Sequence, residues 1–243
     1  YQSVLGMGTS IEESTIYNLL KMTDENRQAF LRRLLDPVNG MGMSLMRVTV
    51  GTSDFTAQDF YTYYDGTGKE LDGKPDWNNV TGKGFSIQKD KDLGIIKVIN
   101  EMQAIAKELG VEDNLKFFAS SWAPPGWMKL PTSSSNSYED NELLLKGGKL
   151  NDDYIDDLAK YMVRYVEEYQ KCGIPIYAMT IQNEPLLEIN YPSCAMTGTQ
   201  EAKIAKAIKA ELAKSTVLKD NEKEVKLWAF DHNFDGADKF MAD

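Results

Sequence analysis

The chain has 243 residues, of which 42% are hydrophobic and 26% charged, values typical of a globular protein with one large core. Its formal net charge of −10 argues against nucleic acid as a partner, because no stripe of lysine and arginine is present to displace phosphate counterions. The longest apolar runs are far shorter than the roughly 20 residues that a membrane-spanning helix needs, so no transmembrane segment is expected.

Cysteine and histidine are too scarce for several kinds of site. The two cysteines, Cys172 and Cys194, are too few for a disulfide framework and match no zinc-binding spacing, so no metal is expected. A Cys–His or Ser–His catalytic pair would have to use His232, the one histidine of the chain. Tyr1 begins no signal peptide, and this start fits a cytoplasmic protein and a mature secreted protein equally well.

Strand-like and helix-like patterns alternate along the whole chain. Strands are predicted over residues 4–9, 43–50, 115–121, 176–182 and 225–230. Helices are predicted over residues 12–22, 24–35, 90–109, 153–171 and 199–215, with a further helix after Gly236. Thr23 suits an N-cap, because two acidic residues follow it in the first turn of the second helix. This alternation predicts a parallel sheet with helical crossovers.

The predicted loops differ in length at the two ends of the strands. Loops that enter strands are short, whereas those that leave the second and third strands run over 51–89 and 122–152. These long loops contain Trp77, Trp122 and Trp127. Elaboration at the carboxyl ends of the strands favours a (β/α)8 barrel, of which about the first five βα units are present. An open doubly wound sheet is the alternative, although no glycine-rich phosphate loop follows any strand.

The strongest local feature is Asn183-Glu184-Pro185, at the end of the fourth predicted strand. Pro185 prevents the strand from continuing, and the end of a barrel strand aims a carboxyl group into the pocket. Glycoside hydrolysis needs one carboxyl group to protonate the leaving oxygen and a second as nucleophile or base. Glu184 is therefore the candidate catalytic acid, and Asn183 can bind a neighbouring sugar hydroxyl.

Polar and aromatic residues also mark the other strand ends: Arg47, Asp54, Trp122, Trp127, Asp231 and His232. Hydroxyl-binding groups beside flat apolar faces are what carbohydrate recognition requires. Each residue also has a structural interpretation. In that interpretation Arg47 serves only to neutralise buried carboxylates. Trp127 then packs beneath a loop, and His232 orients its neighbours.

These motifs together resemble glycoside hydrolase family 30, the barrel family that includes lysosomal glucosylceramidase and bacterial relatives. The resemblance follows the chain in order through residues 6–10, 16–20, 46–48, 53–56, 118–129, 180–185, 191–193 and 228–233. It implies a retaining mechanism on β-linked glycosides, no cofactor, and a (β/α)8 barrel with an attached β-domain. It also favours a secreted or periplasmic location, although the sequence leaves the compartment unknown.

By resemblance, Glu184 is the general acid/base and Asn183 holds the 2-hydroxyl of the sugar. Asp54 and Trp122 resemble residues that bind the far hydroxyls of a terminal glucose. The substrate implied is a β-glucoside of the glucosylceramidase or β-glucosidase type. An endo-β-1,6-glucanase of the same family is the near alternative, and an inactive carbohydrate-binding remnant of the barrel is the alternative of another class.

Four further site residues are assigned through the same resemblance. Arg47 and Tyr191 resemble neighbours that hold the carboxylates in place. Asp231 and His232 match less firmly, because the family varies at the end of the fifth strand. All four are expected to line the substrate pocket with the residues above.

The resemblance departs from the family at the nucleophile, a second glutamate that ends the seventh barrel strand. Asp231 is the nearest candidate in this chain, and it follows the wrong strand. Residues 1–243 are therefore expected to form a single, incomplete catalytic barrel domain that lacks the nucleophile and the β-domain. Such a domain is expected to be inactive alone and to need the missing half of the barrel as its partner.

Overall fold

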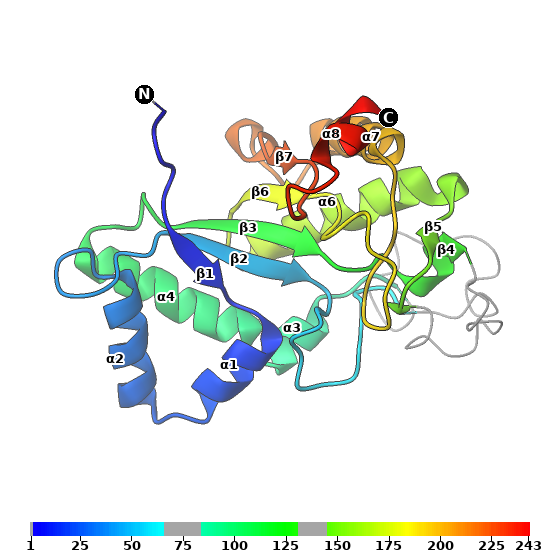
Figure 1. Cartoon of the computed structure of the whole chain (residues 1–243). Helices are drawn as coiled ribbons and strands as arrows, with labels where there is room; N and C mark the ends of the chain where they lie inside the picture. Colours follow the sequence, from blue (N-terminus) through cyan, green and yellow to red (C-terminus); the bar gives the residue numbers. More distant parts are fainter. Residues whose placement is uncertain (1, 66–83, 131–144) are drawn as a thin grey trace.

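The computed structural model describes residues 2–65, 84–130 and 145–243, and a five-stranded sheet forms its centre (Figure 1). The strands are β1 (Gly8–Ser10), β2 (Leu45–Val50), β3 (Lys116–Ser121), β6 (Ile176–Thr180) and β7 (Lys226–Trp228). They lie side by side in chain order, and every neighbouring pair is parallel. A doubly wound sheet reverses its strand order at a switch point, whereas a barrel adds each strand beside the previous one. This order confirms the barrel class, with five strands in the described residues.

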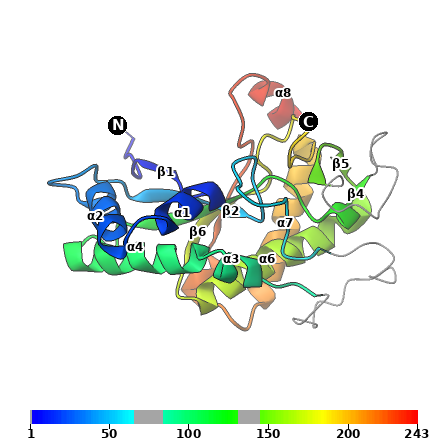
Figure 2. The same ribbon diagram turned by 90° about the horizontal axis from the view of Figure 1, so that it is seen from below.

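Helices pack on one face of the sheet (Figure 1). They are α1 (Glu13–Leu20), α2 (Asp24–Leu35), α3 (Gln88–Asp92), α4 (Ile95–Leu109), α6 (Ile155–Lys171), α7 (Gly198–Lys214) and α8 (Ala237–Ala242). In Figure 2, which views the sheet from below, α3, α4 and α6 lie in front of the strands, and α7 packs against α6. In the part of the chain that the structure describes, no helix combines the length and apolarity needed to cross a membrane.

Several predicted elements differ from the structure in their bounds, two of them because of a particular glycine. The first strand begins at Gly8 and not at residue 4. A Cβ atom on Gly8 would lie 1.3 Å from the carbonyl oxygen of Leu45, so only glycine allows β1 to approach β2 this closely. The predicted helix over 90–109 is divided into α3 and α4 at Gly94, whose φ of +77° is left-handed. The N-cap at Thr23 is confirmed, because its side chain accepts a hydrogen bond from Asn26 N.

The loop after β3 contains a short hairpin that sequence reasoning did not predict, formed by β4 (Lys129–Leu130) and β5 (Lys149–Leu150). Lys129 is buried there, and its ammonium group donates to the carbonyl oxygens of Leu145 (3.0 Å) and Ser193 (2.9 Å). Burial lowers the pKa of Lys129 to about 8. This lysine therefore ties the hairpin to the loop after β6.

The segment that follows β2 is fixed by a buried carboxylate on α3. Tyr61 donates to Asp90 over 3.0 Å, and Tyr63 donates to it over 2.6 Å. Tyr169 of α6 adds a third hydroxyl at 2.6 Å. Asp90 is fully buried, and desolvation raises its pKa from 3.8 to about 6, against the effect of the three hydrogen bonds. The chain just after β2 is thus attached to two helices. Trp77 lies outside the described residues.

The raised pKa of Asp90 predicts a decline in stability between about pH 4 and 6. Below pH 4 the carboxyl group is protonated in both the folded and the unfolded state. As pH rises, the unfolded chain ionises first, so the native state binds the extra proton and the free energy of unfolding falls. The shift from 3.8 to about 6 corresponds to roughly 3 kcal/mol. Urea unfolding at several pH values should show this decline.

Asp90→Asn should remove that part of the pH dependence, because the amide does not titrate. Asp92→Asn is the matched control, since Asp92 ends the same helix and is exposed. Equal slopes for the wild-type protein and Asp90→Asn between pH 4 and 6 would show that Asp90 ionises normally.

Candidate active site

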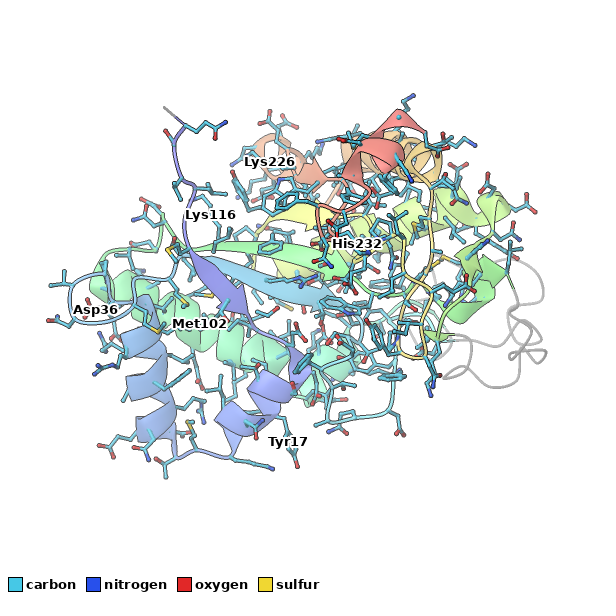
Figure 3. The ribbon with its side chains drawn as sticks, in the orientation of Figure 1. Tyr17, Asp36, Met102, Lys116, Lys226 and His232 are labelled. Atoms are coloured by element: carbon cyan, nitrogen blue, oxygen red, sulfur yellow. The ribbon has the colours of Figure 1, made fainter. Side chains whose placement is uncertain are left out.

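The candidate site lies at the carboxyl ends of the strands, where the predicted residues meet. Figure 3 shows His232 on the face of the sheet opposite Met102 of α4. Lys116 and Lys226 begin β3 and β7 on that same face, at the other end of the strands. Lys226 Nζ lies 4.0 Å from the centroid of the Tyr177 ring. The open face of the sheet therefore has cationic and aromatic residues at one end and the acidic site at the other.

Glu184 lies just beyond β6, in a left-handed conformation with a φ of 51°. Its N–H donates to the carbonyl oxygen of Asp231 over 2.7 Å, and the N–H of Asn183 donates to that of Ser121 over 2.7 Å. These bonds continue the pairing of β6 with both neighbours past its last residue, Thr180. A left-handed glutamate is uncommon and needs such support from its surroundings. The position of Glu184 is thus built into the end of the sheet.

Arg47 on β2 joins three strand ends through one nitrogen atom. Its Nη2 lies 2.5 Å from Asn183 Oδ1, 3.1 Å from Asp231 Oδ2 and 3.1 Å from Ser120 Oγ. The guanidinium carbon lies 4.3 Å from the centroid of the Trp122 ring, which is a cation–π contact. Arg47 therefore neutralises Asp231, and it fixes Asn183 with its carbonyl oxygen as the acceptor. Nδ2 of Asn183 is left to donate to a ligand.

Ser120 completes this network from the end of β3. Its hydroxyl donates to Asp231 Oδ2 over 2.7 Å and accepts from Thr180 Oγ1 over 2.7 Å. Sequence reasoning gave Ser120 no role of its own. Ser120 follows Phe118 by two residues, so both side chains lie on the same face of an apolar strand. This spacing could have predicted that Ser120 points toward the site. Asp231 is therefore already bound by a serine and by Arg47.

Tyr191 provides the side-chain contact to Glu184. Its hydroxyl group lies 3.3 Å from Glu184 Oε2 and donates to it. Partial burial and the nearby charges of Glu184 and Asp54 raise the pKa of Tyr191, so the phenol stays protonated near neutral pH. The carboxylates of Asp54 and Glu184 therefore both lie near the hydroxyl group of Tyr191. Oε1 of Glu184 has no partner among the described residues.

The exposed Asp54 lies in a segment that α1 and its N-cap fix. Ser53 Oγ donates to Glu12 Oε2 over 2.7 Å, and both residues are buried. Glu13 Oε2 accepts from Thr56 Oγ1 over 2.9 Å. Sequence reasoning missed both glutamates, because their partners are more than forty residues away. These contacts leave the Asp54 carboxylate exposed to solvent and available to a ligand.

Two aromatic residues of the long loop are buried. Trp127 is 5% exposed, and its Nε1 donates to the carbonyl oxygen of Tyr64 over 3.1 Å. Its structural interpretation, that it packs beneath a loop, is therefore correct. Trp122 is 4% exposed, with Arg47 over its ring. At most an edge of the Trp122 indole can reach a ligand.

His232 is oriented by its own loop. Its Nδ1 accepts from Asn233 N over 2.7 Å, and its ring stacks on that of Phe230 at a centroid distance of 5.6 Å. Nδ1 is therefore unprotonated in this geometry, and Nε2 is the nitrogen that could donate to a ligand. The histidine is close to the other site residues in the chain, but within the described residues its contacts are local.

A groove of about 630 Å³ lies next to the loop after β6, where Pro185 and Leu186 line it and Glu184 does not. It runs between β5 and the first turn of α7, where Gln200 and Lys203 line it. Leu186 is half exposed at its edge. The groove is therefore lined by both polar and apolar residues, and it shares only the loop after β6 with the candidate acid.

Comparison with known proteins gives one consistent result. The model of the Glycosyl hydrolase family 30 TIM-barrel domain matches residues 4–241. Endo-1,6-beta-D-glucanase neg1 of Aspergillus fumigatus is 29% identical over 239 residues, which cover 96% of this chain and 45% of that protein. Lysosomal acid glucosylceramidase of Mus musculus is 26% identical over 203 residues, which cover 83% of this chain and 35% of that protein.

A solved structure shows the same relationship. The endo-beta1,6-glucanase BT3312 matches with a TM-score of 0.77 and 30% identity, over 100% of this chain and 47% of that one. The chain thus spans less than half the length of these relatives.

Proposed function

The chain belongs to glycosyl hydrolase family 30, and we propose that it supplies the acid/base half of a retaining β-glycosidase site. The observation that carries this proposal is the position of Glu184. Its backbone is held in a left-handed conformation at a strand end, and its side chain is half-buried with one oxygen on Tyr191. A carboxyl group fixed in this way can transfer protons to and from a bound glycoside.

In this proposal, Glu184 first protonates the glycosidic oxygen as the sugar is transferred to the nucleophile. It then removes a proton from the water that releases the sugar. Because Tyr191 donates to Oε2, Oε1 is the oxygen available to the leaving group. Nδ2 of Asn183 would bind the 2-hydroxyl, and Asp54 and the accessible edge of Trp122 would bind hydroxyls at the far end of the sugar. His232 would contact the ligand through Nε2, the nitrogen that Asn233 leaves free.

We further propose that the nucleophile lies outside residues 1–243, and that these residues are one part of a catalytic barrel. A retaining enzyme needs two carboxyl groups about 5–5.5 Å apart. Asp231 is bound by Arg47 and Ser120, so its negative charge is already neutralised. The fraction of each relative that the chain covers agrees with a site completed by further sequence.

We propose a β-glucoside as the substrate class, and the enzyme could cleave it in two ways, at the chain end or within the chain. A glucosidase would remove one terminal glucose, which Asp54 would hold. The second candidate is an endo-β-1,6-glucanase, because relatives described as endo-1,6-glucanases are 28–30% identical to this chain.

The test is hydrolysis by the full-length protein, followed by proton NMR on an aryl β-glucoside and on a β-1,6-glucan. We expect the β-anomer of the product to appear first, as retention requires. Early formation of the α-anomer, or no hydrolysis of either substrate, would contradict the proposal. Release of glucose alone from the polymer would indicate a glucosidase, whereas oligosaccharides would indicate the endo-acting enzyme.

A further inference from the structure

A second buried carboxyl group lies behind the candidate site. Glu201 is in the first turn of α7, is 2% exposed, and shares a helix face with Ile204 and Ile208. Its Oε2 accepts a hydrogen bond from Phe230 N over 3.1 Å, and its Oε1 has no partner among the described residues. A buried carboxyl group with one oxygen unsatisfied costs stability. Its position therefore calls for an explanation other than stability.

The hydrogen-bond donor, Phe230, has an unusual backbone. Its φ of 53° is left-handed, which for a bulky residue is strained by roughly 1–2 kcal/mol. Its ring is packed between that of His232 and that of Phe240 on α8, with centroids 5.6 and 5.0 Å away. Glu201 thus accepts the one hydrogen bond that Phe230 N donates among the described residues.

The next residue, Asp231, connects this bend to the site. Its carbonyl oxygen accepts the N–H of Glu184 over 2.7 Å, and its carboxylate accepts from Arg47 and Ser120. A change in the bend at Phe230 would move both groups of Asp231 at once. The hydrogen bond that fixes the backbone N–H of Glu184 on the β7 side therefore depends on this bend.

We propose that Glu201 is a positioning residue, which holds the left-handed bend at Phe230 and so sets Asp231 against Glu184 and Arg47. This inference rests on the proposed role of Glu184. Burial and the charge of Asp231 raise the pKa of Glu201 to about 7, while the N–H of Phe230 opposes that shift. The N-terminal end of α7 also favours the charged form. Either form keeps an oxygen that can accept from Phe230.

The experiment compares Glu201→Ala with Glu201→Gln in the full-length protein. The alanine variant loses the acceptor, so we expect kcat to fall about tenfold with little change in KM, because Glu201 touches no substrate. The glutamine variant keeps a carbonyl oxygen and should retain at least about half of kcat. Hydrogen exchange at the amides of Phe230 and Glu184 should accelerate in Glu201→Ala and stay slow in Glu201→Gln.

A matched control separates positioning from loss of a buried carboxyl group. Glu167 on α6 is also buried, and it accepts from Ser215 Oγ over 2.6 Å, away from the strand ends. Glu167→Ala should lower the melting temperature and leave kcat unchanged. Equal losses of kcat in Glu167→Ala and Glu201→Ala would overturn the proposal.

Glycine at position 230 provides a second test that does not depend on one variant folding. Glycine adopts a positive φ freely, so in a Phe230→Gly background the bend no longer needs Glu201. Adding Glu201→Gln or Glu201→Ala to Phe230→Gly should then change kcat less than about twofold. A full tenfold loss in that background would contradict the proposal.

The two proposals can fail separately. If the wild-type protein hydrolyses no glycoside, the proposed function fails, and the exchange of the Phe230 and Glu184 amides alone decides the role of Glu201. If Glu184→Gln is inactive while Glu201→Ala has normal kcat and normal exchange, only the positioning role is wrong.

Discussion

Glu184→Gln in the full-length protein is expected to reduce the hydrolysis of alkyl glycosides by about 10²–10⁴-fold, the usual contribution of general acid catalysis. Glutamine has nearly the same size and keeps an oxygen that can accept from Tyr191, so the fold should be unaffected. What is lost is the proton for the glycosidic oxygen and the base for the water. Steady-state kinetics on an alkyl β-glucoside would measure the loss.

The dependence on the leaving group makes this prediction specific. A phenol with a low pKa leaves without protonation, so formation of the glycosyl-enzyme from an aryl glucoside should survive in Glu184→Gln. Its hydrolysis then becomes slow because no base activates the water. Added azide needs no base, and it should restore turnover and yield a β-glucosyl azide.

Glu188→Gln is the matched control, because Glu188 is exposed in the same loop and its carboxylate accepts from Gly148 N over 3.2 Å. It should retain normal activity on both substrates. Equal losses on aryl and alkyl glucosides in Glu184→Gln, without rescue by azide, would mean that Glu184 is not the acid/base.

The sequence predicted the class of fold because its patterns are local. Each βα unit of a barrel repeats one strand, one helix and one turn, so apolar periodicity and cap residues such as Thr23 suffice to find them. The bounds failed where a contact distant in sequence decides them. Gly8 begins β1 because it meets Leu45, and Gly94 divides a helix beside Leu20. Neither neighbour can be read from the local pattern.

The sequence also predicted that the candidate site residues follow neighbouring strands, and they lie close together because parallel strands bring their carboxyl ends together. It could not predict which side chains satisfy one another. The contacts of Arg47 with Asn183 and Asp231 join residues 136 and 184 positions apart. The buried Glu201 did leave a signal in the sequence, because it is an acidic residue on a helix face that otherwise consists of Ile204, Ile208 and Leu212. An acidic residue on such a face deserves a search for its partner.

Arg47→Ala is expected to reduce kcat/KM of the full-length protein by about 10²–10³-fold, comparable with the loss of a donor that stabilises a transition state. Removal of the guanidinium leaves Asp231 with only the hydroxyl of Ser120. It also frees the side-chain amide of Asn183 to rotate, so the 2-hydroxyl would lose a fixed donor. Steady-state kinetics on an aryl β-glucoside would measure the effect.

Arg47→Lys separates the charge from the geometry. A lysine could neutralise Asp231, but it cannot contact Asn183 and Ser120 while lying flat over Trp122, so we expect no more than about a tenfold recovery. Arg32→Ala is the control: Arg32 is exposed on α2, pairs with Glu108 of α4, and should leave activity unchanged. A substrate without its 2-hydroxyl tests the contact with Asn183. Because Arg47→Lys keeps the charge and loses the contact with Asn183, a 2-deoxyglucoside should lose less activity than the glucoside between the wild-type protein and Arg47→Lys. Equal losses on both substrates would mean that Arg47 acts only as the counter-ion of Asp231.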